Sequence, residues 1–259
     1  MVTKSFKNYL PPLIAGIIYS FSIPSFLKFS FIGAAFLSHY VFLFFLDPNN
    51  QRRKFSIKNK MMTMLLFSLG TTLSGFYWIP YTLKEFGEIP FPYSQIVGTL
   101  FFLIVFPQYW TFVFICYCTN KFSFLKKWTL RNSTKNILWA STLTLLEIYI
   151  PQQFPAHVGH TFLNMAPFLG LAPIFGTPIF SFAVFWTCLT FIYPPKNTFP
   201  KILFSAMITV FFLSNIIFKL KGNIDSKKSI NIRIVQANVG NYLKVRSERG
   251  HRDSVSGIL

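Results

Sequence analysis

Apolar blocks, each close to the length of one helical membrane crossing (roughly 20 residues), alternate with short charged or proline-rich stretches along most of the chain. Helices of this length and polarity are typical of proteins that cross a bilayer several times. The pattern therefore predicts an α-helical integral membrane protein with about seven transmembrane helices. The predicted spans are Tyr9–Phe26, Phe29–Leu46, Met61–Pro80, Gln95–Cys118, Ile137–Ile150, Ala172–Tyr193 and Lys201–Leu220.

Composition and charge agree with this interpretation. Hydrophobic residues make up 52% of the chain, and charged residues make up 12%, which is about half the share of a soluble domain. The net charge of +18 could suggest a nucleic-acid partner. However, basic residues between spans are what orients a helical membrane protein, and no compact basic module is present. We therefore expect a membrane as partner and no nucleic acid.

The distribution of basic residues predicts the orientation. A cytoplasmic N-terminus places 14 basic residues of the connections inside and only Lys28 and Lys84 outside, as the positive-inside rule requires. The fifth span, Ile137–Ile150, is short and contains Glu147, but omitting it would move two lysines to the outside. The inner residues are Lys4, Lys7, Arg52, Arg53, Lys54, Lys58, Lys60, Lys121, Lys126, Lys127, Arg131, Lys135, Lys196 and Lys201.

The C-terminal part has a different character. Gly222–Ser229 is a polar linker, and residues 229–239 are rich in β-branched residues, which predicts one buried strand. We therefore divide the chain into a polytopic transmembrane domain, residues 1–221, and the beginning of an α/β domain, residues 222–259, which stops soon after its first strand. Its basic residues conflict with an outward position after seven spans.

Candidate binding residues lie between the spans. Tyr77, Trp78 and Tyr81 fit an aromatic belt at the membrane boundary or a binding site. Glu147 is a functional candidate because carboxylates near a span are costly, unless it reaches water at the boundary. His157 and His160 would share a helical face, but a metal site needs a third ligand, so a loop that lines a cleft is the simpler reading.

The spans contain no recognisable catalytic group. Cys116, Cys118 and Cys188 all lie in apolar blocks, where a thiol has no base to activate it. No glycine-rich phosphate loop and no Gly-x-Ser-x-Gly motif occurs. From the residues alone we therefore expect no catalytic residue, no metal site and no cofactor within residues 1–259.

Four stretches, taken in order, resemble the N-terminal membrane portion of bacterial apolipoprotein N-acyltransferase. The first is the Gly/Trp segment 74–83 with the turn 86–90. The second is the region with Trp139, Glu147, Phe154-Pro155 and Gly159-His160. The third is Leu-Ala-Pro-Ile-Phe-Gly at 171–176. The fourth, 232–240, is similar to the first strand of the family's nitrilase-like domain.

The resemblance implies a function and a location. Members of this family transfer an acyl chain from a phospholipid to the N-terminal diacylglyceryl-cysteine of an apolipoprotein, in the bacterial inner membrane and without a cofactor. Their Glu-Lys-Cys triad lies in an extracytoplasmic nitrilase-like (carbon–nitrogen hydrolase) domain between the seventh and eighth spans. That placement accounts for an outward, basic segment 222–259 behind a cytoplasmic N-terminus.

The resemblance also indicates which residues bind substrate. Residues 1–259 contain no position that matches the triad, so we expect no catalytic residue and no acyl transfer by this chain alone. Ala156 stands where the family motif usually has Trp. Two alternatives are a non-catalytic scaffold that binds lipoprotein or phospholipid, and a small transporter. The expected substrate-binding residues are Trp78, Glu147, Phe154, Pro155 and His160.

Overall fold

The structure is a computed structural model that describes residues 2–23, 31–51, 56–121, 131–154, 157–162, 172–196 and a few single residues between 198 and 213. The chain divides into two compact units. The first consists of Met1–Tyr77 and Thr99–Gly222, and the second of Trp78–Gly98 and Asn223–Leu259. Of the second unit, residues 78–98 are described.

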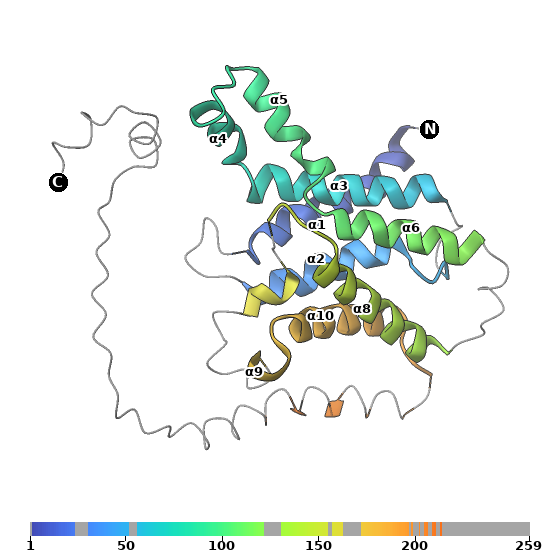
Figure 1. The fold of residues 1–259 in the computed structure, drawn as a ribbon. Coiled ribbons are helices and arrows are strands. Elements are labelled where there is room, and N and C mark those ends of the chain that lie inside the picture. The colour runs from blue at the N-terminus through green and yellow to red at the C-terminus, as the bar shows by residue number, and fades with distance from the viewer. Residues whose placement is uncertain are drawn as a thin grey trace, which may run out of the picture. The chain divides into compact units, whose positions relative to one another are not determined.

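The described residues are mostly helical (Figure 1). The first unit contains α1, α2, α3, η1, α6, α8, α9 and α10, while the second contains α4. Helix α5 runs across the boundary between the units. The bounds are α1 Val2–Ser20, α2 Ile32–Leu46, α3 Ile57–Gly75, α4 Ile79–Glu85, α5 Tyr93–Leu100, η1 Phe101–Leu103, α6 Pro107–Lys121, α8 Asn132–Tyr149, α9 Ala172–Phe175 and α10 Pro178–Ile192.

The helices follow the predicted spans with differences at prolines. Helix α2 ends at Leu46 as predicted, and α8 is longer than the predicted fifth span. The third, fourth and sixth spans were each predicted as one helix, but each is divided in two. New helices begin beside Pro80, Pro107 and Pro178, because a proline has no N–H to continue the preceding helix but fits the first turn of a new one.

A helix crosses a membrane by itself only if it is both long enough and apolar enough. Within the described ranges no single helix is both long and apolar enough to cross by itself. Two pairs of successive helices, α3 with α4 and α5–η1 with α6, meet the requirement jointly. The seventh predicted span lies mostly outside the described residues, as does the strand predicted at 229–239.

Small residues allow α1 and α3 to pack closely. Gly16 lies against the backbone of Phe67, and Gly70 lies against the backbone of Leu13, so neither position has room for a Cβ. The Thr71 hydroxyl donates a hydrogen bond to the Gly16 carbonyl at 3.0 Å. Small residues and a hydroxyl bridge of this kind are typical of helix pairs in membranes, where close packing replaces the hydrophobic effect.

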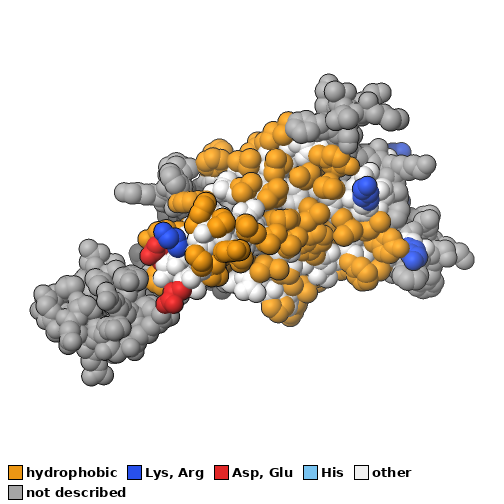
Figure 2. All heavy atoms as spheres, turned by 90° about the horizontal axis from the view of Figure 1, so that it is seen from above, with side chains coloured by type: hydrophobic (Ala, Val, Ile, Leu, Met, Phe, Trp, Pro, Cys, Tyr) orange, Lys and Arg blue, Asp and Glu red, His pale blue; other side chains and the backbone are white. Residues whose placement is uncertain are grey.

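Large apolar side chains lie on the outside of the first unit. Figure 2 shows a face on which hydrophobic side chains cover most of the described surface and charged side chains are few. Phe21, Leu37, Leu73, Phe114 and Phe191 are among those exposed. Apolar surface of this extent indicates contact with lipid or with another protein, since soluble monomers rarely expose it.

Candidate functional site

Glu147 lies on the inner face of α8. That face repeats at helical spacing through Asn136, Ala140, Leu143 and Thr144, all of which are buried. Only 2% of Glu147 is exposed. The alternative that this carboxylate reaches water at the membrane boundary is therefore wrong, because the segment that follows α8 folds back over it.

The carboxylate of Glu147 anchors the segment 157–162. Its Oε1 accepts a hydrogen bond from the Val158 N–H at 3.2 Å. The next amide, of Gly159, donates to the Ser181 hydroxyl oxygen of α10 at 2.7 Å. Gly159 also lies so close to the carbonyl of Thr177 that a Cβ would not fit. The segment is thus fixed between α8 and α10 by two buried backbone donors.

A second polar link joins α6 to the end of α8. The Gln152 amide donates to the Glu147 backbone carbonyl at 2.9 Å, and Gln108 donates to Gln152 Oε1 at 3.3 Å. Among the described residues, Glu147 Oε2 and Gln108 Oε1 are buried and have no hydrogen-bond partner. Two such acceptors are suited to a ligand or water that donates hydrogen bonds.

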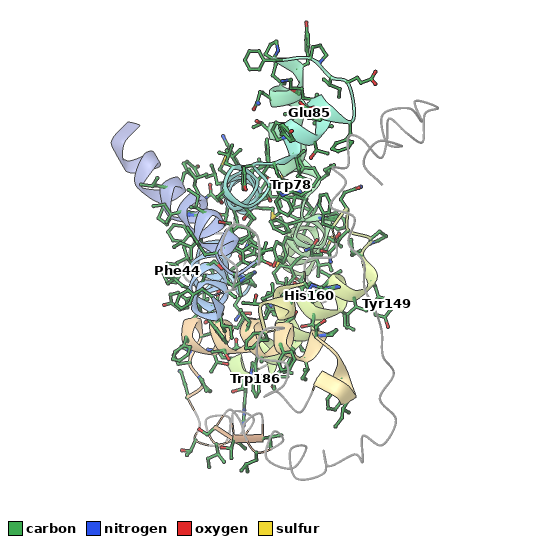
Figure 3. The ribbon with its side chains drawn as sticks, turned by 90° about the vertical axis from the view of Figure 1, so that its left-hand side faces the viewer. Phe44, Trp78, Glu85, Tyr149, His160 and Trp186 are labelled. Atoms are coloured by element: carbon green, nitrogen blue, oxygen red, sulfur yellow. The ribbon has the colours of Figure 1, made fainter. Side chains whose placement is uncertain are left out.

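His160 lies on the same segment, which follows Tyr149 at the end of α8 (Figure 3). Its ring meets that of His157 edge to face, with centroids 4.9 Å apart. Partial burial lowers the pKa of both imidazoles, and His157 lowers that of His160 further. Neutral imidazoles can ligate metals, but no group of three or more His, Cys, Asp or Glu is placed to hold an ion in the part of the chain described here.

Phe154 lies in an aromatic cluster of the first unit. Its ring stacks on Phe76 at 5.7 Å and meets Phe101 at 5.7 Å with an interplanar angle of 63°. Its neighbour in the motif, Pro155, lies outside the described residues. Trp78 begins the second unit. The structure thus brings Glu147 and the segment of His160 together, and describes Phe154 in its own cluster.

A buried His–Tyr pair was not anticipated from the sequence. The His39 Nδ1–H donates to the Ala35 carbonyl at 2.8 Å, which leaves Nε2 to accept from the Tyr109 hydroxyl at 2.8 Å. Both residues are fully buried, and Tyr19 meets the imidazole edge to face at 4.9 Å. The available signal was an ionisable residue inside the predicted span Phe29–Leu46. The predicted spans therefore contain a second buried ionisable residue besides Glu147, which bears on the alternative of a small transporter.

A third polar cluster surrounds the end of α2. The Lys60 ammonium donates to the Leu46 carbonyl at 2.5 Å and the Asp47 carbonyl at 2.6 Å. The Tyr193 hydroxyl donates to the Asp47 carboxylate, and Asn136 donates to the Tyr193 carbonyl at 3.0 Å. Because these bonds join the ends of four helices, α2, α3, α8 and α10, we assign this cluster to structure.

The three cysteines do not form a reactive site in this arrangement. Cys116 and Cys188 are buried and Cys118 is partly buried, and these three described thiols form no disulfide. The Cys188 thiol donates to the Phe36 carbonyl at 3.4 Å. A thiol needs a nearby base or cation to act as a nucleophile. The cation that acts on Cys116 is Lys60, and its ammonium is bonded to two backbone carbonyls at the end of α2.

These features define the class of protein: a helical domain with an apolar surface, tightly packed small-residue helix contacts and buried polar clusters, as in membrane proteins. A family model, the apolipoprotein N-acyltransferase N-terminal domain, matches residues 15–190. This match covers more than half of the chain, so the chain belongs to this family. The resemblance found in the sequence is thereby confirmed, and the chain is a membrane-associated protein. No curated protein matches the chain.

Proposed function

We propose that residues 1–259 form the membrane part of an apolipoprotein N-acyltransferase of the bacterial inner membrane. In this proposal the donor is a phospholipid, and the acceptor is the N-terminal diacylglyceryl-cysteine of an apolipoprotein. The observation that carries the proposal is the family match over residues 15–190. The fixed segment 157–162, with the buried Glu147 Oε2 beside it and without a hydrogen-bond partner among the described residues, supports a binding role.

Each expected substrate-binding residue has a distinct part in this proposal. Glu147 positions the segment 157–162 and offers Oε2 to a donor group of the substrate. His160 lines that segment as a neutral imidazole, while Phe154 offers an apolar ring to an acyl chain. Trp78 and Pro155 are assigned to the same function on the resemblance alone.

We assign the chemical step to none of these residues. Acyl transfer through a thioester needs a nucleophilic thiolate and a base to generate it. Among residues 1–259 no position matches the family's Glu, Lys and Cys. A polypeptide of these residues should therefore bind substrate without transferring an acyl group.

The binding test uses the chain in phospholipid nanodiscs with a fluorescent diacylglyceryl lipopeptide. Binding should occur and should weaken at least several-fold in Glu147→Gln, whereas Leu73→Val, on the exposed face of α3, should have no effect. The mass of the lipopeptide should remain unchanged after incubation. A gain of one acyl chain that depends on the protein and disappears when Cys118 is replaced would contradict the assignment of chemistry elsewhere.

The orientation is proposed from the basic residues of the sequence: N-terminus in the cytoplasm, residues 222–259 outside. Single cysteines at positions 53 and 127 should react with a membrane-impermeant maleimide only from the cytoplasmic side. Cysteines at positions 88 and 153 should react only from outside. Labelling of position 127 from outside would overturn this orientation.

The buried His39–Tyr109 pair favours one competing function, a small transporter, because ionisable groups inside spans often mark ion pathways. Solute uptake into proteoliposomes that His39→Phe abolishes would support that function. Capture of the lipopeptide without any uptake would support the membrane part of an acyltransferase or a scaffold.

A further inference from the structure

The helical hairpin formed by α4 and α5 has an unusual distribution of side chains. Its inner contact is made by small residues, since a Cβ at Gly98 would lie 2.6 Å from the Pro80 Cγ. Ser94, one turn earlier on α5, is also buried. The Ile89 N–H donates to the Leu83 carbonyl at 3.2 Å and closes the connection between the helices.

The large apolar residues of α5 point outward. Tyr93 is 62% exposed, Ile96 53%, Val97 47% and Leu100 48%. Their spacing of i, i+3, i+4 and i+7 places them on one face of the helix. In water this distribution is unfavourable, because burial of apolar area is worth about 25 cal/mol per Å² and here the small residues are buried instead.

A polar face completes the helix. Gln95 is exposed and Thr99 is partly exposed. At about 100° per residue these two positions lie roughly 130° from the centre of the apolar face. Three faces therefore divide α5: one apolar and outward, one of small residues packed on α4, and one polar. A helix wholly inside the hydrocarbon core has no use for the polar face, whereas a helix at the membrane–water interface uses all three.

The neighbouring residues have the composition of the same interface. Exposed aromatic residues flank both helices, and the hairpin's Lys84 is 60% exposed. Trp78, at the start of α4, and Glu85, at its end, mark the length of that helix in Figure 3. Aromatic rings and a lysine are the usual anchors at the level of lipid headgroups. The exposed aromatic residues are Tyr77, Trp78, Tyr81, Phe91 and Tyr93.

The helix is interrupted after α5, and a side chain provides a hydrogen bond to a backbone carbonyl at this break. Helix η1 ends at Leu103, and α6 begins at Pro107. The Trp110 indole N–H donates to the Leu103 carbonyl at 3.0 Å, which is one of the groups released by the break. Irregular backbone at membrane depth requires such a partner. Leu103 and Ile104, in the first unit, are exposed as well.

We propose that the α4–α5 hairpin, residues 78–100, lies in the membrane–water interface of the lipid bilayer as an in-plane element. The stripe Tyr93, Ile96, Val97 and Leu100 contacts acyl chains, and Gln95 faces water. This inference concerns the lipid surface that covers the hairpin, and it holds whether or not the protein binds lipoprotein.

Spin-label accessibility tests this placement in the full chain. The three native cysteines are replaced by alanine, and one label is attached at Ile96→Cys or, as the matched control on the same helix, Gln95→Cys. Each variant is measured in phosphatidylcholine/phosphatidylglycerol nanodiscs after gel filtration confirms an unchanged elution volume. Leu73→Cys, on the exposed face of α3, provides a lipid-facing reference, and Lys58→Cys, exposed in the first turn of α3 and outside the hairpin, provides a water-facing one.

The label at 96 should collide several-fold more often with oxygen than with a water-soluble nickel chelate, and the label at 95 should show the reverse. Preference for oxygen at both positions would overturn the proposal in favour of a hairpin that enters the bilayer core. Low collision with both reagents at both positions would mean that protein covers the hairpin. Nickel preference at position 96 would mean that the stripe faces water.

Discussion

The hydrogen bond from Val158 to Glu147 allows the role of this carboxylate to be divided into structure and binding. Replacement of Glu147 by alanine removes the acceptor that the buried Val158 N–H has among the described residues. Replacement by glutamine keeps one carbonyl oxygen that can accept the same bond. Both replacements remove the ionisable carboxyl group, but only glutamine keeps an oxygen that can accept a hydrogen bond. A comparison of the two variants therefore separates the effect of the acceptor from the effect of the charge.

The magnitude follows from leaving a buried donor unsatisfied. An N–H without a partner costs about 1–3 kcal/mol, and the segment 157–162 should open more readily by that amount. Since each 1.4 kcal/mol is a factor of ten, amide exchange of Val158 should accelerate about 5- to 150-fold in Glu147→Ala. Gly159 should follow, because its bond to Ser181 depends on the same placement of the segment.

Hydrogen exchange measured by mass spectrometry on peptides that contain residues 157–162 is the assay. Glutamine should leave exchange within a few-fold of the unsubstituted chain, and a peptide from α2 should not change in either variant. If alanine leaves the exchange of 157–162 unchanged, Glu147 does not anchor the segment. If glutamine exchanges as fast as alanine, the charge and not the acceptor geometry stabilises it.

Two further substitutions test the packing of the first unit, with thermal unfolding in detergent as the measurement. Gly70→Val should destabilise by about 1–3 kcal/mol or more, because its side chain would displace the backbone of α1, whereas Leu73→Val on the exposed face should be nearly neutral; equal effects would refute the close contact. His39→Phe should cost about 1–3 kcal/mol by leaving the Tyr109 hydroxyl unpartnered, and Tyr109→Phe should cost less in that background than alone. Strict additivity of the pair would exclude the hydrogen bond.

The sequence predicted the positions of helices better than their continuity. The end of α2 at Leu46 and the helix around Glu147 followed from apolar length and from the balance of basic residues. The breaks before Pro107 and Pro178 were not predicted, although a proline inside an apolar block is a warning. Hydropathy averages over a window and therefore does not register a missing backbone donor, which is what ends a helix.

Part of the site could be predicted from the sequence, because an ionisable residue in an apolar block is visible there, whereas its partners in space are not. Glu147 could be singled out because a carboxylate in an apolar block is costly, but its burial could not, since its partner Val158 comes from a later segment. His39 lies inside the predicted span Phe29–Leu46 and carries the same kind of signal as Glu147. Its partner, Tyr109, is 70 positions away, and no local pattern indicates that contact.

The buried ionisable groups of the first unit differ in how completely they are satisfied. Asp47 and Lys60 are bonded within a cluster that joins four helices, and both nitrogens of His39 have partners. The carboxylate of Glu147 keeps one oxygen without a partner among the described residues. An unsatisfied buried acceptor costs stability. An oxygen that makes no hydrogen bond within the fold therefore favours a role in binding. By this argument the end of α8 is a place where a substrate's donor group would complete the hydrogen bonding.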